Sequence, residues 1–472
     1  MKNETSTDSE QAERSAWKTA LGGAPNDREQ ALPVLQRLQA QAGPQYQCPG
    51  ESELISRAVH LSRQARFYPA CRDCPHADVP AVPCETTTTG QVVTARRVVT
   101  SGSVPGAWRK IYLNEFDRSD AEKLALSIAA EFWRAHPRRA RTDDDVVLNT
   151  RTETHGPDVV VARDFRPSSA DIACGVVRGL RRMGCRVTEL GVVCRPTMDF
   201  AVYHLRSAGG VFITGAGGDA ATTGVDVIGE DGVPWSQPGR LSALGDWRRA
   251  PVSRESRKSG TVQLYDLAAA ERTDLSRHFH GLRQGRLGII FDDPRLAAES
   301  ARWWDGSGCE VTTLTLPGIP FGATELPVDA RRQLRTTVQS QSLSMVARIA
   351  DDARQVQLFD ELARPIDPAD CLLRLAEAEL AAQGSGTIVL DSLVPGAVRG
   401  RLRAHGARLE IVDETEETLV AGLATSDGLL AADGRGRIWF RDHYPVCHGL
   451  ITVARLWRVA MELEQPLRHW SA

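Results

Sequence analysis

The run 209–232, GGVFITGAGGDAATTGVDVIGEDG, constrains the fold more than any other stretch of this chain. It begins with a short apolar strand at 211–213, continues through a glycine-rich loop at 214–221, and ends in a second strand-like segment that closes on Gly232. Glycine lets a loop adopt backbone conformations that other residues avoid. The pattern therefore predicts two strands joined by a glycine-rich loop.

Upstream, the sequence predicts a βαβ unit. An apolar strand at 159–162 is followed by a helix that we expect to be capped by Ser168 or Ser169 and to end near Gly184, and then by another strand. Before this unit, the segment Ser119-Asp-Ala-Glu122 has the form of a capping box, so a helix should run from there to Pro137.

Two further α/β stretches follow. The second contains a strand at 287–293 and a helix through Trp303 and Trp304. The third starts with Asp367 as an N-cap and Pro368 at the first helical position, continues through a strand at 387–391, and ends in an amphipathic helix at 450–463. A length of 472 residues also favours about three domains. We therefore expect three consecutive α/β domains, in which sheets are flanked by helices.

Composition excludes several classes of function. The formal net charge of −3 argues against nucleic-acid partners and against anionic membranes. The first 20 residues are polar, and nowhere do about 18 apolar residues run together, so we expect neither a signal peptide nor a membrane span. A cytoplasmic location with reduced thiols follows.

Four of the ten cysteines fall within a short N-terminal extension: Cys48, Cys71, Cys74 and Cys84. The C-x2-C pair within FYPACRDCPH could hold one ion, and the other two could complete a four-sulfur shell for Zn²⁺ or an iron–sulfur cluster. Four reduced cysteines on a small subdomain are the alternative. The preceding residues, 1–45, read as a flexible segment with one short helix at 28–41.

A dinucleotide site is a second interpretation of the glycine-rich loop, because 215–220 fits G-x-G-x-x-A. That fingerprint requires a helix directly after it. Here the β-branched residues Thr222, Thr223 and Val225 follow, interrupted by Gly224. This interpretation is therefore disfavoured.

The run 209–232 resembles the active-site segment of the α-D-phosphohexomutases, the phosphoglucomutase and phosphomannomutase family, in which a GGI strand leads into T-A-S-H-N-P. The match places Ala216 at the position of the phosphate-carrying serine and Gly217 at the position of the histidine. Neither residue can replace its counterpart, because a methyl group cannot form a phosphate ester and glycine cannot transfer a proton. The resemblance thus implies a kept frame without intact catalytic residues.

Two other family motifs are altered in the same way. The metal loop F-D-G-D-x-D-R aligns with 349–355, where the three ligand positions hold Ala350, Asp352 and Arg354. Only Asp352 remains as a residual metal ligand, so Mg²⁺ is not expected. The sugar loop E-E-S-G-H reads Asp433, Gly434, Arg435, Gly436 and Arg437.

The family's R-D-x-R motif is kept as Arg163, Asp164 and Arg166. The resemblance makes Arg163, Arg166, Asp433, Arg435 and Arg437 candidate ligand-binding residues, with a salt-bridged or solvated role as the alternative. A sugar phosphate is the expected ligand.

The resemblance also sets domain boundaries. They are a flexible segment at 1–45, a Cys-containing extension at 46–95, and phosphohexomutase-like domains with mixed sheets at 96–244, 245–362 and 363–472, without the family's fourth domain. We expect a catalytically inactive relative with a binding or regulatory role, in which the extension contacts a protein partner. An active phosphohexomutase is the alternative.

Overall fold

The computed structural model describes residues 45–52, 54–56, 59, 60, 63, 74, 108–136, 156–236, 238–245, 247, 248, 256, 258–300, 302–304 and 306–470. The chain divides into two compact units, Met1–Arg96 and Arg97–Ala472. In the first unit, β1 (Gln45–Gln47) pairs antiparallel with β2 (Leu54–Ser56). The helix expected at 28–41 lies outside the described residues.

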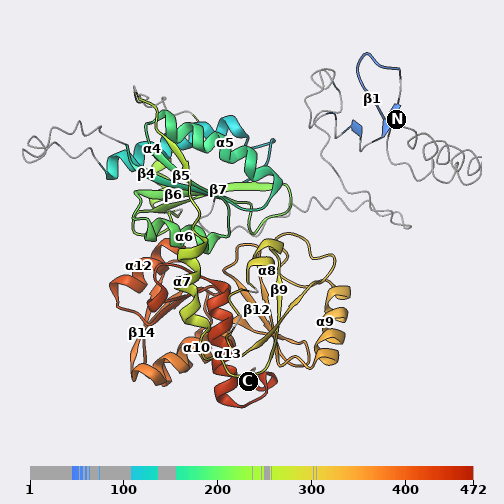
Figure 1. Cartoon of the computed structure of the whole chain (residues 1–472), viewed down its shortest axis with the longest axis vertical. Coiled ribbons are helices and arrows are strands. Elements are labelled where there is room, and N and C mark those ends of the chain that lie inside the picture. The colour runs from blue at the N-terminus through green and yellow to red at the C-terminus, as the bar shows by residue number, and fades with distance from the viewer. Residues whose placement is uncertain are drawn as a thin grey trace, which may run out of the picture. The chain divides into compact units, whose positions relative to one another are not determined.

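The second unit contains three sheets, and the first has the strand order β3-β7-β6-β4-β5-β8. Strands β4, β5, β6 and β7 of this sheet are labelled in Figure 1. Strands β6, β4, β5 and β8 are parallel, whereas β7 and β3 run antiparallel to their neighbours. The strands are β3 (Trp108–Ile111), β4 (Asp158–Arg163), β5 (Arg186–Val192), β6 (Gly209–Ile213), β7 (Thr222–Gly229) and β8 (Val262–Leu264). The two strands and the loop expected from 209–232 are thus confirmed.

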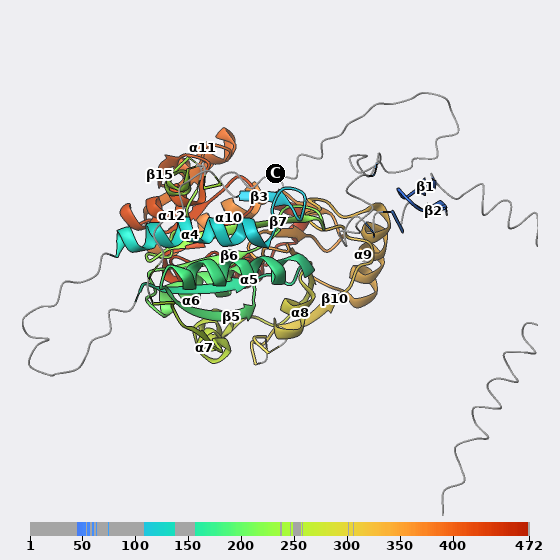
Figure 2. The ribbon, with the colours of Figure 1, turned by 90° about the horizontal axis from the view of Figure 1, so that it is seen from above.

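Helices cover both faces of this sheet. Helices α4 (Arg118–Ala135) and α5 (Pro167–Arg182) lie side by side on one face, where alternate residues of β4 such as Val159 and Val161 are buried (Figure 2). Helices α6 (Arg195–His204) and α7 (Ala268–Phe279) pack on the other face against Val160 and Ala162. Burial on both faces explains the continuous apolar run of β4.

Two helix caps differ from the sequence predictions. Helix α4 is capped by Asp117, whose side chain accepts a hydrogen bond from the backbone of Asp120, and not by Ser119. Helix α5 begins at Pro167 with no side-chain cap, because the hydroxyl of Ser169 donates to Asp164 instead. The prediction for Asp367 is confirmed, since this residue caps α10.

The second and third sheets are also mixed. The second has the order β10-β9-β11-β12-β13 and the third β15-β14-β16-β17. Their strands are β9 (Arg286–Phe291), β10 (Glu310–Leu314), β11 (Met345–Ile349), β12 (Val356–Phe359), β13 (Pro365–Ile366), β14 (Gly386–Asp391), β15 (Ala407–Val412), β16 (Leu430–Ala432) and β17 (Ile438–Phe440).

The sheets extend past the boundaries expected from the sequence. Strand β8 at 262–264 pairs with β5 in the first sheet, although 245 was expected to begin the second domain. Strand β13 at 365–366 pairs with β12 in the second sheet, although 363 was expected to begin the third. Both strands are short and extend the edge of a sheet, so their backbone pairing assigns each to the sheet before the expected domain boundary.

The remaining helices connect the second and third sheets. Helix α9 packs on one face of the second sheet and α12 on one face of the third. The opposite faces share one core, to which α10 and α13 contribute. The bounds are α8 (Pro294–Ser300), α9 (Val328–Gln341), α10 (Pro368–Gln383), α11 (Gly396–Ala404), α12 (Glu416–Thr425) and α13 (Gly449–Leu463). Of the helices in the described part of the chain, not one is long and apolar enough to cross a membrane.

Candidate functional site

The glycine-rich loop between β6 and β7 contains Ala216, which is 7% exposed. The loop is held from below by Asp164, whose carboxylate accepts hydrogen bonds from the backbone N–H groups of Gly215 (2.9 Å) and Arg166 (3.0 Å). Thr214 Oγ1 accepts a hydrogen bond of 3.0 Å from the N–H of Ala216. Polar side chains therefore fix the backbone around a residue that has only a methyl group.

Arg166 fastens the same loop from the side. Its guanidinium donates to the carbonyl oxygens of Gly218 (2.9 Å) and Asp219, and it forms an ion pair of 2.7 Å with Asp351. The side chain is 2% exposed. Because these contacts occupy its donors, Arg166 acts as a structural clamp, which is the salt-bridged alternative considered for this residue.

One of the connections between elements of the second sheet packs against the glycine-rich loop. The connection between β10 and α9 brings Phe321 under the guanidinium of Arg166, at 4.7 Å from the ring centroid. Gly322 approaches so closely that a methyl group built on it would lie 2.9 Å from the carbonyl oxygen of Gly218. The loop around Gly217 is therefore packed against protein.

The loop between β11 and β12 corresponds to the altered metal loop. Asp352 accepts hydrogen bonds from the backbone N–H groups of Arg354 (2.9 Å) and Gln355 (3.1 Å). Its second oxygen lies 3.4 Å from Nε of Arg354. Asp352 thus has its oxygens engaged within its own loop, and the Arg354 guanidinium carries the same sign of charge as a metal ion.

These residues do not fit Mg²⁺, which takes oxygen ligands in near-octahedral geometry. Within the described residues, no group of three or more His, Cys, Asp or Glu side chains is placed to hold a metal ion.

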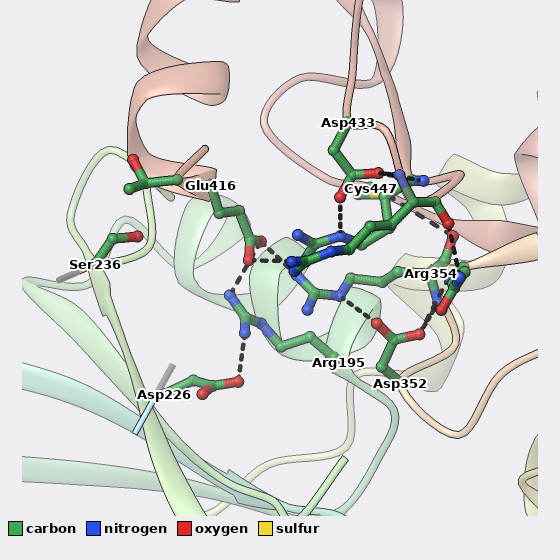
Figure 3. Close-up of polar contacts among 12 residues, drawn as sticks. Arg195, Asp226, Ser236, Asp352, Arg354, Glu416, Asp433 and Cys447 are labelled. Atoms are coloured by element: carbon green, nitrogen blue, oxygen red, sulfur yellow. Dashed lines mark hydrogen bonds and ion pairs between the residues drawn. The ribbon is translucent and has the colours of Figure 1, made fainter. Parts of the chain in front are cut away.

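Glu416, at the first position of α12, is the centre of an ion-pair cluster (Figure 3). Three arginines converge on its carboxylate: Arg354 from the metal loop, Arg437 at 3.3 Å, and Arg195 at 3.6 Å. All four side chains are at most 10% exposed. Glu416 therefore joins a helix of the first sheet, a loop of the second and a loop of the third.

The cluster continues into the first sheet through Asp226 on β7. Its carboxylate accepts from Arg195 (2.7 Å) and, with both oxygens, from Arg109 on β3 (2.6 and 3.2 Å). Arg109 also donates to the carbonyl oxygen of Ala216 at 3.2 Å. A chain of ion pairs thus runs from the backbone of Ala216 to Glu416.

The altered sugar loop is folded on itself. Asp433 accepts hydrogen bonds from the backbone N–H groups of Arg435 (3.0 Å) and Arg437 (2.9 Å). Its carboxylate also forms an ion pair of 2.6 Å with Nε of Arg437. The carbonyl oxygen of Arg435 accepts a hydrogen bond of 2.6 Å from the side-chain amide of Gln355 in the metal loop. Asp433 and Arg437 therefore pair with each other and stabilise the conformation of this loop.

The charges in this cluster perturb one another strongly. Burial opposes ionisation of Asp226, but the positive charges of Arg109 and Arg195 outweigh it and lower the pKa of this carboxyl. Burial likewise opposes ionisation of Glu416 and Asp352, and their arginine neighbours lower both pKa values. For Asp351, burial prevails over the charge of Arg166 and raises the pKa to about 6.

The structure brings together only some of the residues expected from the sequence. Asp352, Asp433 and Arg437 belong to the ion-pair cluster and Arg166 is paired with Asp351, so all four charged groups have partners inside the protein. Arg163 and Arg435 are partly exposed, and their side chains form no ion pair with any described residue. Cys48 and Cys74 are buried, with Arg63 donating to Cys48 Sγ at 3.2 Å, and Cys71 and Cys84 lie outside the described residues.

Sequence reasoning missed Arg195 and Glu416 and gave Asp226 no role. Asp226 is the lone charged residue in strand β7, and this was a usable signal, because a charge in a buried strand needs a buried partner. Nothing in the sequence near Glu416 distinguishes it from an ordinary first-turn carboxylate.

Comparisons with known proteins show which family and fold the chain resembles. Residues 145–241 match the family model "Phosphoglucomutase/phosphomannomutase, alpha/beta/alpha domain I". The chain is 22% identical over 313 residues to a phosphoglucomutase/phosphomannomutase of Thermococcus kodakarensis, with 64% of this chain and 68% of that protein covered. It is 25% identical over 337 residues to a phosphoglucosamine mutase of Frankia alni, with 66% and 70% covered.

A solved structure shows the same fold. A phosphoglucomutase/phosphomannomutase family protein from Burkholderia thailandensis superposes with a TM-score of 0.63 at 18% identity, covering 79% of each chain. The expected α/β fold with mixed sheets flanked by helices is thereby confirmed.

Proposed function

Because the chain belongs to the phosphoglucomutase/phosphomannomutase family, we propose that it has lost the mutase reaction and acts as a binding or regulatory protein linked to sugar phosphates. The observation that carries this proposal is Ala216, a buried methyl group where the resemblance places the phosphate-carrying serine. Without a nucleophilic oxygen at this position the phosphoryl group has no covalent carrier.

The ion-pair cluster supports the proposal independently. A mutase of this kind would need a cation beside the nucleophile to stabilise charge on the transferring phosphate. Here Arg354 stands at the third metal-ligand position and is paired with Glu416. Restoring a metal would require both the loss of this guanidinium and the release of Asp352 from its own loop.

A binding role rests on the arginines that the cluster does not use. Arg163 ends β4 at the carboxyl edge of the first sheet, and Arg435 lies in the altered sugar loop. Both are partly exposed and form no ion pair with a described residue. Guanidinium groups bind phosphate in a bidentate manner. We assign the sugar phosphate to these residues, and a protein partner to the Cys-bearing unit Met1–Arg96.

One observation favours the alternative, an active phosphohexomutase. The loop folds back so that the side chain of Thr222 lies against Gly218, and its hydroxyl donates to Asp219 at 2.9 Å. A hydroxyl next to a carboxylate is a possible nucleophile and base. Thr222 is 5% exposed, which leaves little room for a sugar phosphate to approach it.

A turnover assay separates the two functions. The purified chain is incubated with mannose 1-phosphate or glucose 1-phosphate, glucose 1,6-bisphosphate and Mg²⁺, and both product and intact protein mass are measured. We expect no product above a no-protein blank and no phosphorylated chain. Turnover that disappears in Thr222→Ala would establish the alternative.

The binding role is tested by calorimetric titration with mannose 1-phosphate and glucose 1-phosphate. We expect Arg435→Ala to weaken binding by about tenfold, the usual effect of removing a charged hydrogen-bond donor. Arg403→Ala, an exposed arginine in α11, is the matched control and should bind like the unaltered chain. Equal affinity of the Arg435→Ala variant would remove Arg435 from the site.

A further inference from the structure

A cavity lies on the other side of the first sheet from α4 and α5. It has a volume of about 660 Å³, within the range of small-molecule sites. Its walls come from the end of β5 and the start of α6, from the segment joining β8 to α7, and from the end of α8 with Trp303. No residue of the loops at 214–221, 350–354 or 433–437 lines it, so it is separate from the site described above.

Glu271 on α7 is a buried carboxylate in the lining of this cavity, at 8% exposure. One carboxylate oxygen accepts a hydrogen bond of 2.5 Å from Thr197. The other oxygen accepts no hydrogen bond, and the group forms no ion pair, with any described residue. A buried carboxylate without a cation is costly, so an outside partner would satisfy it.

Hydrogen bonding behind Glu271 fixes its orientation. Since Thr197 gives its proton to Glu271, the contact of 3.1 Å between Cys194 Sγ and Thr197 Oγ1 must have the thiol as donor. Burial raises the pKa of Glu271 to about 7 against the opposing bond from Thr197, and the neighbouring carboxylates Glu299 and Asp274 raise it further. Among the described residues, no arginine, lysine or histidine forms an ion pair with Glu271.

The rest of the lining suits an apolar body with a positive end. Leu190, Val193 and Leu267 supply aliphatic surface, and Tyr265 and Trp303 supply aromatic rings, which attract cations to their faces. The charged residues of the lining are the carboxylates Glu189, Asp266, Glu271 and Glu299 and the exposed guanidiniums Arg272 and Arg302. When Glu271 is ionised, four negative and two positive side chains give the lining a formal net charge of −2.

We propose that this cavity binds an aromatic or aliphatic ammonium compound, whose positive nitrogen is held by the free oxygen of Glu271 while its apolar part packs against Trp303, Tyr265 and Leu267. The site is separate from the proposed sugar-phosphate site, so a negative result for one proposal does not contradict the other.

The test is a titration of the full chain at pH 8, where Glu271 is ionised, with phenethylamine and tryptamine, measured by calorimetry and by ligand-observed NMR. Phenylpropionate and indolepropionate, which exchange the ammonium for a carboxylate on the same apolar body, are the ligand controls. We expect the amines to bind and the acids not to bind. Failure of both amines, or equal binding of the acids, would overturn the proposal.

Two variants identify the site. Glu271→Gln keeps the shape of the side chain and removes its charge, so it should weaken amine binding at least about tenfold. Ala268→Trp places a large ring at the exposed mouth of the cavity without altering Glu271, and should also abolish binding. Glu325→Gln, an exposed carboxylate outside the lining, is the matched control. Unchanged affinity in both cavity variants would exclude this cavity as the amine site.

Discussion

At the scale of single residues, Glu416 stabilises the ion-pair cluster, because arginines of three different segments share its carboxylate. Removing one member of a buried ion-pair group leaves the others charged without a partner. We predict that Glu416→Ala lowers the free energy of unfolding by about 3–5 kcal/mol in urea denaturation. Glu414→Ala, an exposed neighbour, should change it by less than about 0.5 kcal/mol. A small effect in both would mean that the arginines find other partners.

The residues of this site were only partly predictable from the sequence. Ala216 and Arg354 could be identified because the loops that carry them keep the spacing of the family motifs. Arg195, Asp226 and Glu416 could not, because their importance comes from contacts between segments far apart in the chain. Spacing along a sequence predicts which residues share a loop, whereas burial and ion pairing across sheets depend on the assembled fold.

At the scale of elements, the connection between β10 and α9 closes the glycine-rich loop, and two of its glycines allow a matched comparison. Gly318 and Gly322 have φ of 71° and 69°, but of the two only Gly322 touches the backbone of Gly217 and Gly218. We predict that Gly318→Ala costs about 1–2 kcal/mol for the left-handed backbone. Gly322→Ala should cost more, since its methyl group also collides with the loop. Equal melting temperatures would show that the connection is not held against the loop.

Strand β7 provides a pH-dependent test through Asp226. Its pKa is lower in the folded chain than the value of about 3.9 expected when unfolded, so the unfolded chain binds the proton more readily. The stability that Asp226 contributes is therefore complete above about pH 4 and is lost as the pH falls. We predict that the loss of stability in Asp226→Asn is largest near pH 7 and shrinks toward pH 3, as measured by urea unfolding.

Asp158→Asn is the control for this experiment. Asp158 pairs with Arg186 in the same sheet, but both side chains are nearly half exposed. Exposed pairs contribute about 0–1 kcal/mol, so this variant should show little change with pH. A difference for Asp226→Asn that does not vary with pH would contradict the role of its ionised form.

Several elements followed from local patterns, but the helix expected through Trp303 and Trp304 ends at Ser300, before both tryptophans. The strands at β4, β6 and β14 and the cap at Asp367 were predictable because alternation, apolar runs and Asp-Pro pairs act locally. The caps of α4 and α5 were not. At α5 the hydroxyl of Ser169 donates to Asp164, a contact that tertiary packing creates.

At the scale of the whole molecule, the second and third sheets share one hydrophobic core, whereas the chain before Arg97 forms a separate unit. We predict that a chain comprising residues 97–472 folds by itself and melts within about 2 °C of the full chain in calorimetry. A large decrease in melting temperature would show that the first unit contributes to the stability of the second.

The first unit has its own test through its cysteines. If Cys48, Cys71, Cys74 and Cys84 bind Zn²⁺ or an iron–sulfur cluster, untagged protein will contain about one equivalent of zinc or the iron of one cluster by elemental analysis. Cys74→Ser should then lose the metal, while Cys174→Ser, an exposed cysteine in α5, should keep it. Metal-free protein would leave four reduced thiols.

The placement of Glu416 among Arg195, Arg354 and Arg437 has one further consequence. The arginines already possess an internal counter-ion, so any phosphate that reached them would have to displace it. The measured affinity for phosphate would then reflect competition between phosphate and the Glu416 carboxylate for the same guanidinium groups. Phosphate would bind only the fraction of molecules in which Glu416 has moved away from the arginines, which lowers the apparent affinity. A variant with a neutral side chain at Glu416 would bind oxyanions more tightly even as it became easier to unfold.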